Sequence, residues 1–142
     1  MNEIISEVNS MDDLGVIFDQ KANFQEHYKK ITSKAYKSIF MLNRSFKFSS
    51  MNVKTRLYKS FILPLVEYAS SVWNPHKRMN CITIERVQRR ATKYILGNSS
   101  LTYNERLKIC KLDKLESCRA IADLCIVFKL IHYNIPQFNK PC

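Results

Sequence analysis

The sequence is short of glycine, with only Gly15 and Gly97 among its 142 residues. Sandwiches and barrels of β-strands need many tight turns, and glycine is the residue that most readily allows such turns. The shortage therefore favours helices, and we expect a mainly α fold: a bundle of about five helices with a short N-terminal β-strand. Two isolated glycines also leave no glycine-rich loop of the kind that cradles phosphate groups.

The chain also lacks any uncharged apolar run approaching the ~20 residues that a membrane span requires, so we expect no membrane span. Its N-terminus is acidic and lacks the basic start and apolar block of a signal peptide. The five cysteines are odd in number, which indicates reduced thiols. We therefore expect an intracellular protein, located in the cytoplasm or the nucleus.

A third absence is the Cys-x-x-Cys pattern that is typical of zinc sites. Cys118, Cys125 and His132 are instead spaced by seven residues. That spacing is a rise of about 10.5 Å on a helix, too far for side chains that share one zinc ion. We expect these three side chains to pack inside on one helix face, and we assign no metal site.

Positive charge is abundant and unevenly distributed, within a formal net charge of +11. Residues 1–20 carry five acids and no base, whereas residues 21–60 carry ten bases and one acid, a net +9. Residues 77–114 carry ten bases and three acids, a net +7. Two basic segments of this kind suit a polyanionic partner such as nucleic acid. The alternative is a solvated surface that binds no partner.

One short run near the N-terminus is typical of a β-strand. Residues 14–18 are β-prone and lie between Asp13 and Asp19. A strand needs a partner, which is either a hairpin mate within residues 1–12 or another part of a longer protein. We prefer the second interpretation.

Apolar residues recur with helical spacing in the rest of the chain. The first helix begins near Phe24, and its apolar stripe consists of Phe24, Tyr28, Ile31, Ala35, Ile39 and Leu42. The second begins near Met51, with Ser49 or Ser50 as the N-cap. Further helices are expected over residues 81–96, 102–109 and 113–133, the last of them apolar on most sides and therefore part of the core or of an interface.

Proline and aromatic residues shape the second helix. Pro64 cannot donate to the carbonyl of Ser60, which predicts a kink or a break at that point. The helix carries two apolar stripes, so we expect it to be buried on both. The stripes consist of Val53, Leu57, Phe61 and Leu65, and of Tyr58, Ile62, Ala69 and Trp73.

The basic helix over residues 81–96 is the best candidate for a binding site. Four basic side chains lie opposite its apolar face: Arg86, Arg89, Arg90 and Lys93. Arginine forks match phosphate oxygens, and a row of cations on one helix face can follow a nucleic-acid backbone. The alternative is a basic all-helical module that binds an acidic protein or a membrane surface and has no role with nucleic acid.

Candidate catalytic groups are few. Asp12 and Asp13 are adjacent, and clustered carboxylates can hold magnesium ions, but the third carboxylate of such sites comes from a separate upstream strand that we do not find. We interpret the pair as the cap of a short strand. The histidines His27, His76 and His132 have no nucleophile in a recognisable arrangement. We expect no catalysis by this chain alone and no cofactor.

A series of short motifs, in chain order, resembles a known family. They are Asp13-Leu14-Gly15-Val16, Phe24 with Glu26-His27, Leu57-Tyr58, Pro64 with Glu67-Tyr68-Ala69-Ser70, Val72-Trp73-Asn74-Pro75, Ile84-Glu85 with Val87-Gln88-Arg89-Arg90-Ala91, Tyr103 with Glu105-Arg106-Leu107, Leu112 with Leu115-Glu116, and Asp123-Leu124. The order resembles the C-terminal part of the reverse transcriptase of non-LTR (LINE-like, Jockey-type) retrotransposons, over about residues 12–135.

The resemblance implies a division of the chain and a set of contacts. Residues 1–20 would be the end of a palm-like segment, residues 21–135 a helical domain like the thumb and connection, and residues 136–142 a tail. The thumb of that family holds the template–primer duplex, so Arg86, Arg89, Arg90 and Lys93 would contact phosphates. Lys30, Lys34 and Lys37 on the first helix would do the same.

The resemblance also implies what is missing. Trp73 and Tyr68 would pack in the thumb core. The palm and its catalytic carboxylates, which use Mg²⁺ in the family, and the fingers are absent, so either could be supplied by another region or a partner chain. Where relatives show a pair of arginines after Leu115-Glu116, this chain has Ser117-Cys118-Arg119, which removes one expected basic contact.

Overall fold

The structure of the protein is a computed structural model, which describes residues 9–97 and 100–132. Its elements are β1 (Ser10–Asp13), β2 (Val16–Asp19), α1 (Gln25–Ser45), α2 (Met51–Leu57), the π-helical turn η1 (Tyr58–Ile62), α3 (Leu63–Glu67), α4 (Ser70–Trp73), α5 (Arg78–Leu96), α6 (Tyr103–Cys110) and α7 (Leu115–His132). The prediction of a mainly α fold with a short N-terminal β element is confirmed.

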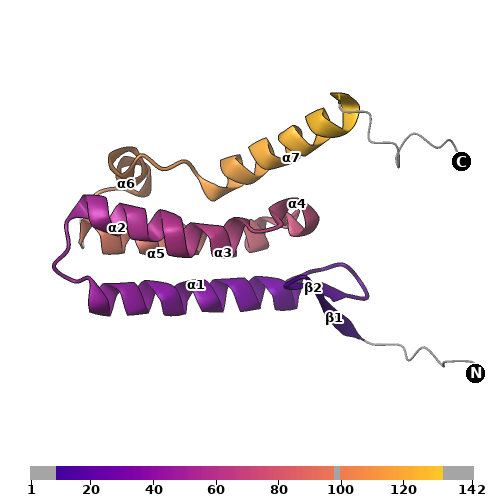
Figure 1. Cartoon of the computed structure of the whole chain (residues 1–142), viewed down its shortest axis with the longest axis horizontal. Helices are drawn as coiled ribbons and strands as arrows, with labels where there is room; N and C mark the ends of the chain where they lie inside the picture. Colours follow the sequence, from indigo (N-terminus) through magenta and orange to yellow (C-terminus); the bar gives the residue numbers. More distant parts are fainter. Residues whose placement is uncertain (1–8, 98–99, 133–142) are drawn as a thin grey trace, which may run out of the picture.

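Three long helical segments form the body of the molecule (Figure 1). α1 lies along one edge, the continuous rod α2–η1–α3 lies above it, and α5 packs against both. The core between them is made of buried apolar side chains from all three segments, among them Ala35, Ile62 and Val87, each fully buried. α6 and α7 lie on the other side of the rod from α1.

The N-terminal strand finds its partner within the chain, so our preference for a partner elsewhere was wrong. β1 and β2 form an antiparallel hairpin in which Asp13 pairs with Val16 and Ser10 with Asp19. The two-residue loop has φ of 47° at Leu14 and 87° at Gly15. Positive φ at both central residues is what a type I′ hairpin turn requires, and only Gly15 meets this requirement without a side-chain clash.

The apolar stripe predicted for α1 faces the core. Tyr28, Ile31, Ala35, Ile39 and Leu42 are all buried, and Phe24 packs against them. Their spacing of three and four residues places them on one side of a helix with 3.6 residues per turn. The confirmed stripe fixes which side of α1 is left for charged residues.

The effect of Pro64 on the rod lies in the turn that precedes it, η1. The rod does not break there, because the preceding turn, η1, adopts π-helical hydrogen bonding and so needs no N–H at Pro64 for the carbonyl of Ser60. The stripe that contains Tyr58 and Ile62 lies in the core, and both side chains are fully buried. In the other, outer stripe, Leu57 and Leu65 are partly buried against the core, whereas Val53 and Phe61 are exposed. The expectation that both stripes are buried is therefore wrong for Val53 and Phe61.

Trp73 holds the end of the rod against α1. Its indole is fully buried, its Nε1 donates to the carbonyl of Tyr68 at 2.8 Å, and its own carbonyl accepts from the Tyr28 hydroxyl at 2.8 Å. The packing role predicted for Trp73 is thus confirmed. Tyr68 differs from the prediction, because its ring is 58% exposed and its hydroxyl donates to the Leu14 carbonyl at the hairpin tip.

α6 is fixed to α5 by polar side chains. Thr102 and Glu105 form a reciprocal capping box at its start, which satisfies two backbone N–H groups. The buried Arg106 donates through Nε to the Thr92 hydroxyl and through a terminal nitrogen to the Leu101 carbonyl. α6 therefore forms part of the rigid body despite its short length.

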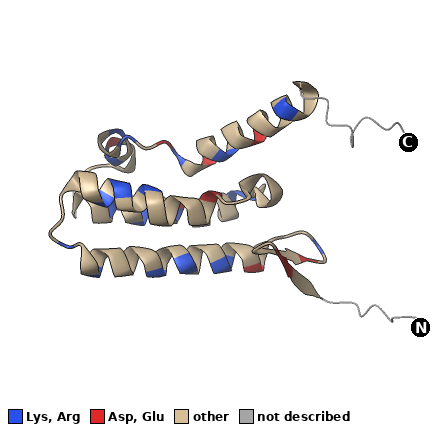
Figure 2. Cartoon of the chain, in the orientation of Figure 1, with Lys and Arg blue, Asp and Glu red and all other residues tan. Residues whose placement is uncertain are grey.

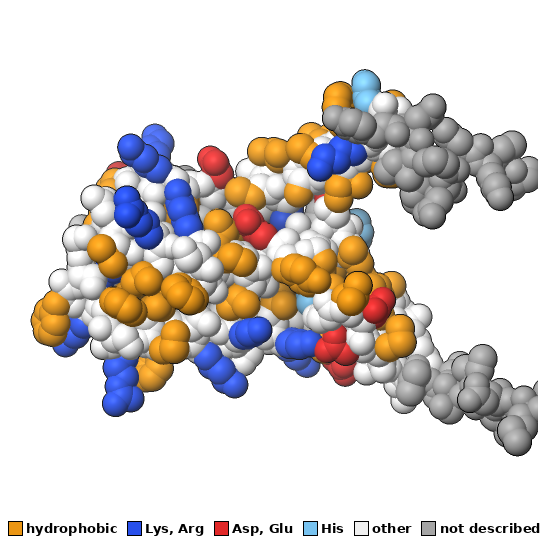
Figure 3. All heavy atoms as spheres, viewed as in Figure 1, with side chains coloured by type: hydrophobic (Ala, Val, Ile, Leu, Met, Phe, Trp, Pro, Cys, Tyr) orange, Lys and Arg blue, Asp and Glu red, His pale blue; other side chains and the backbone are white. Residues whose placement is uncertain are grey.

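α7 packs only through its first turns. Leu115 and Arg119 are its buried residues, and its C-terminal half diverges from α3 and α4 (Figure 1). Figure 3 shows hydrophobic side chains along this half, on the visible face. Cys118 is half-buried, but Cys125 and His132 are exposed, so they do not pack inside as expected.

The end of the predicted 113–133 helix and the 136–142 tail lie outside the described residues. Across residues 9–97 and 100–132, no helix is both long and apolar enough to cross a membrane.

Candidate nucleic-acid interface

A groove of about 1010 Å³ lies between α1, α2 and α5. All four basic residues predicted from the 81–96 segment line it: Arg86, Arg89, Arg90 and Lys93. Lys47 and Lys54 join them from α1's end and from α2, and the other lining residues are Tyr36, Ile39, Phe40, Asn43, Tyr94 and Gly97. Among the residues that the structure describes, the groove therefore carries six cationic side chains and no carboxylate.

α5 has a buried apolar face and an exposed basic face, and this explains why its cations face outward. Ile84, Val87, Ala91 and Ile95 are buried on its inner side at spacings of three and four residues. Arg86, Arg90 and Lys93 repeat with the same spacings on the opposite side, where they are exposed. One helix thus anchors the groove to the core and supplies most of its positive charge.

Arg89 is held in place by an aromatic neighbour. Its guanidinium lies 4.3 Å from the centre of the Tyr103 ring, a cation–π contact that the first turn of α6 provides. The Tyr103 hydroxyl donates to a carboxylate oxygen of Glu85. Burial and this hydrogen bond to a carboxylate raise the pKa of Tyr103, so the hydroxyl remains protonated and Arg89 is supported by a neutral ring.

Tyr94 organises the opposite end of the groove. The ammonium of Lys54 lies 5.2 Å from the centre of its ring, and its hydroxyl donates to the Leu42 carbonyl at 3.2 Å. Burial raises the pKa of Tyr94, which keeps this donor protonated. Lys47 and Lys54 were not singled out from the sequence. Lys54 reaches the groove through the packing of α2 on α5, and Lys47 lies in the segment between α1 and α2.

The three predicted lysines of α1 lie elsewhere. Lys30, Lys34 and Lys37 are exposed and do not line the groove, since they occupy the side of α1 away from its buried stripe. Figure 2 shows basic segments spaced along α1 and acidic segments in the adjoining hairpin. Of the seven predicted contact residues, the four of α5 therefore line the groove. The three lysines of α1 form a separate outer row.

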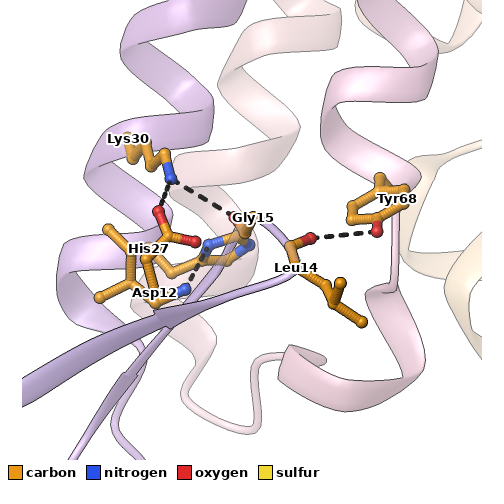
Figure 4. A network of polar contacts seen from close by, with 7 residues as sticks. Asp12, Leu14, Gly15, His27, Lys30 and Tyr68 are labelled. Atoms are coloured by element: carbon orange, nitrogen blue, oxygen red, sulfur yellow. Dashed lines mark hydrogen bonds and ion pairs between the residues drawn. The ribbon is translucent and has the colours of Figure 1, made fainter.

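Lys30 is already engaged by an acid of the hairpin. Its ammonium lies 2.5 Å from a carboxylate oxygen of Asp12 and 3.5 Å from the Gly15 carbonyl (Figure 4). The hydrogen bond from Lys30 lowers the pKa of Asp12. Asp12 thus forms an ion pair with Lys30. The described residues contain no group of three or more acidic, cysteine or histidine side chains placed to hold a metal ion.

The same network joins the hairpin to the helices. The Ile17 N–H donates to Nδ1 of His27 at 3.3 Å, and the Tyr68 hydroxyl donates to the Leu14 carbonyl at 3.1 Å (Figure 4). His27 is buried against Trp73, with ring centres 5.3 Å apart. Burial lowers the pKa of His27, and the positive charge of Lys30 lowers it further, so the ring is neutral at pH 7 and accepts the Ile17 N–H.

The cysteines in the described residues are unpaired thiols. Burial raises the pKa of the Cys110 and Cys118 thiols, so both are protonated near neutral pH. A protonated thiol is a poor nucleophile and a poor metal ligand. Cys110 and Cys118 therefore behave as packing residues.

Comparison with known proteins adds little to the site. No family model and no solved structure matches the chain. An uncharacterized protein of Caenorhabditis elegans, B0403.1, is similar, with 26% identity over 102 residues. The match covers 70% of this chain and 52% of that protein, so the chain spans about half the length of the relative it matches.

Proposed function

We propose that the groove between α1, α2 and α5 binds the phosphate backbone of nucleic acid without sequence preference. The observation that carries this proposal is that six cations and no acid line one groove in the part of the chain that the structure describes. Lysine and arginine side chains bind phosphates by charge and displace condensed counterions, which supplies most of non-specific affinity. Contacts of this kind fix position on the nucleic acid but read no bases.

The wider proposal concerns the origin of the chain. The ordered motifs support a fragment of a retrotransposon RNA-directed DNA polymerase that lacks the catalytic palm, with the helices acting as its thumb. Such a fragment would bind the template–primer and would have no polymerase activity by itself, since its Mg²⁺-binding carboxylates would belong to the palm. It would act inside the cell, in the cytoplasm or nucleus, beside a palm and fingers supplied by another region or chain.

The first test is binding to a labelled RNA–DNA hybrid across a salt series. The wild-type chain is compared with a groove variant in which Arg86, Arg89, Arg90 and Lys93 are changed to alanine. Each lost phosphate contact reduces the slope of log K against log salt by about 0.7 to 0.9, so the groove variant should lose about three to four units of slope.

An outer-row variant provides the matched control. Changing Lys30, Lys34 and Lys37 to alanine removes three charges from α1 outside the groove. The groove variant should lose more slope for each charge removed than the outer-row variant, in which Lys30 is already paired with Asp12. Equal losses for each charge would show that net charge, and not the groove, governs binding.

The rival function from the sequence, a basic module for acidic proteins or membrane surfaces, is tested in parallel. Vesicles of anionic lipid are titrated with the same three proteins, because basic helices also bind such surfaces. Preferential binding of wild type to the hybrid supports the proposal. Binding to vesicles with none to the hybrid at low salt would overturn it.

A further inference from the structure

Two aromatic side chains of α1 line the groove and are not covered by the core. Phe40 is 70% exposed and Tyr36 is 39% exposed. They are four residues apart, so they lie one helical turn apart on the same side of α1. Packing among the described residues leaves the Phe40 ring mostly in water, beside the cations of the groove.

The groove has walls of different chemistry. α1 contributes the aromatic side chains of Tyr36 and Phe40, whereas α5 contributes three arginines and a lysine. None of the described residues that line the groove is acidic, so none of them competes for the cations or repels a phosphate. A ligand that fills this groove should therefore carry a planar, stackable surface on one side and a row of negative charges on the other.

We propose that this groove takes an unpaired nucleic-acid strand, with bases stacked on Phe40 and Tyr36 and phosphates held by α5. The inference rests on the proposed function and narrows it to the single-stranded part of a template–primer. In a duplex the bases are stacked on each other inside the helix, so Phe40 would meet only the backbone. In a single strand every base has a free π-face, and proteins that bind such strands combine aromatic platforms with a basic groove.

The test compares a single-stranded oligonucleotide with a hairpin duplex of equal total charge, each fluorescently labelled and titrated by anisotropy. Phe40→Ala should weaken binding of the single strand by roughly 5- to 150-fold, the range expected for loss of one stacked base. Binding of the duplex should change little. Phe40→Trp should restore single-strand binding, because indole also presents a stacking surface.

Phe61→Ala is the matched control. Phe61 is also a mostly exposed phenylalanine, at 55%, but it lies in η1 and does not line the groove. This variant should bind both ligands as wild type does. A loss equal to that of Phe40→Ala would show that any exposed aromatic contributes, and would overturn the assignment of Phe40.

The salt series separates stacking from charge. Phe40→Ala should lower single-strand affinity at every salt concentration without changing the slope, since a ring releases no counterions. The groove variant lacking Arg86, Arg89, Arg90 and Lys93 should lower the slope instead. If Phe40→Ala leaves both ligands unaffected, or weakens both equally, base stacking is wrong while backbone binding stands. If wild type binds neither ligand at low salt, both proposals fail.

A spectroscopic signal provides a second measurement. The single native tryptophan, Trp73, is fully buried, so Phe40→Trp adds an indole at the groove whose emission can be followed in a Trp73→Phe background. Titration with the single strand should quench this emission, as expected for a ring in contact with bases, and the duplex should not. Equal quenching by both would overturn the preference for unpaired strands.

Discussion

The groove and the C-terminal half of α7 are opposites within one chain. The groove is lined by cations that water solvates well, and its α5 wall stands on a row of buried apolar residues. The outer half of α7 leaves Leu124, Phe128 and Ile131 more than half exposed. A helix that is apolar all round is normally buried, whereas a basic surface is stable in water. Within the described residues, the α5 wall of the groove is supported by a packed core, whereas the outer half of α7 has no such support.

Trp73 and Phe128 allow the largest test of the difference between the packed body and the outer half of α7. Trp73→Ala should lower the free energy of unfolding by about 3–5 kcal/mol, because it leaves a cavity in a packed core. Phe128→Ala should change it by no more than about 0.5 kcal/mol, because its ring is 56% exposed. Urea denaturation followed by far-UV circular dichroism measures both.

Since Trp73→Ala can consume much of the stability of a small domain, Trp73→Phe serves as the milder variant. It should cost less than the alanine variant and still more than Phe128→Ala. Equal costs at Trp73 and Phe128 would mean that α7 is packed as tightly as the body, which would remove the contrast.

The packed body around Trp73 and the outer half of α7 should also differ in their response to acid. The pKa of His27 is lowered by burial, so the unfolded chain takes up a proton at this site more readily than the folded chain. The stability that neutral His27 provides is present in full above the unfolded pKa of about 6.5 and is lost as the pH falls through the lower folded pKa. The free energy of unfolding should therefore decrease below about pH 6.5.

Matched histidine variants identify the source of that decrease. His27→Gln retains an acceptor for the Ile17 N–H but cannot take up the proton, so its stability should fall less steeply between neutral and mildly acidic pH. His132→Gln, in the exposed end of α7, should keep the wild-type slope. If the slope is the same in all three proteins, carboxylates and not His27 cause the acid sensitivity.

The smallest stability effect is expected on α7 itself. Leu124→Gln with Ile131→Gln should change the free energy of unfolding by no more than about 0.5 kcal/mol per site and should reduce the fluorescence of a dye that binds exposed apolar surface. The control is Val53→Gln with Phe61→Gln on the outer stripe of the rod. A loss of stability of several kcal/mol in the α7 variant would show that this helix is part of the core.

Periodicity in the sequence predicted the helices because each buried stripe repeats every three or four residues, as Ala35, Ile39 and Leu42 do in α1. It also predicted the α5 half of the groove, since Arg86, Arg90 and Lys93 follow the same spacing. Lys54, Tyr103 and Tyr94 escaped prediction because their roles depend on contacts between helices that are distant in sequence. The hairpin was the alternative that we did not prefer. Its turn lacks the usual sequence signal, because Leu14 is not a residue that normally accepts positive φ.

The exposed stripe of the rod and the outer half of α7 show the limit of such patterns. Apolar spacing indicates a surface that water should not cover, but it does not say whether the cover belongs to the same chain. Phe61 and Phe128 have the periodicity of core residues and remain exposed here. Periodicity therefore predicts which helix faces are apolar, and tertiary contacts decide which of those faces are buried.

The π-helical turn before Pro64 has a consequence for ancestry. A turn that closes its hydrogen bonds five residues apart accommodates one residue more than an α-helical turn of the same height. A related protein without Pro64 could therefore have one residue fewer between Tyr58 and Ile62. Its rod would be an unbroken α-helix, and Trp73 would keep its position against α1. Alignments of this chain with its relatives should be expected to open a single-residue gap there, paired with the presence or absence of the proline.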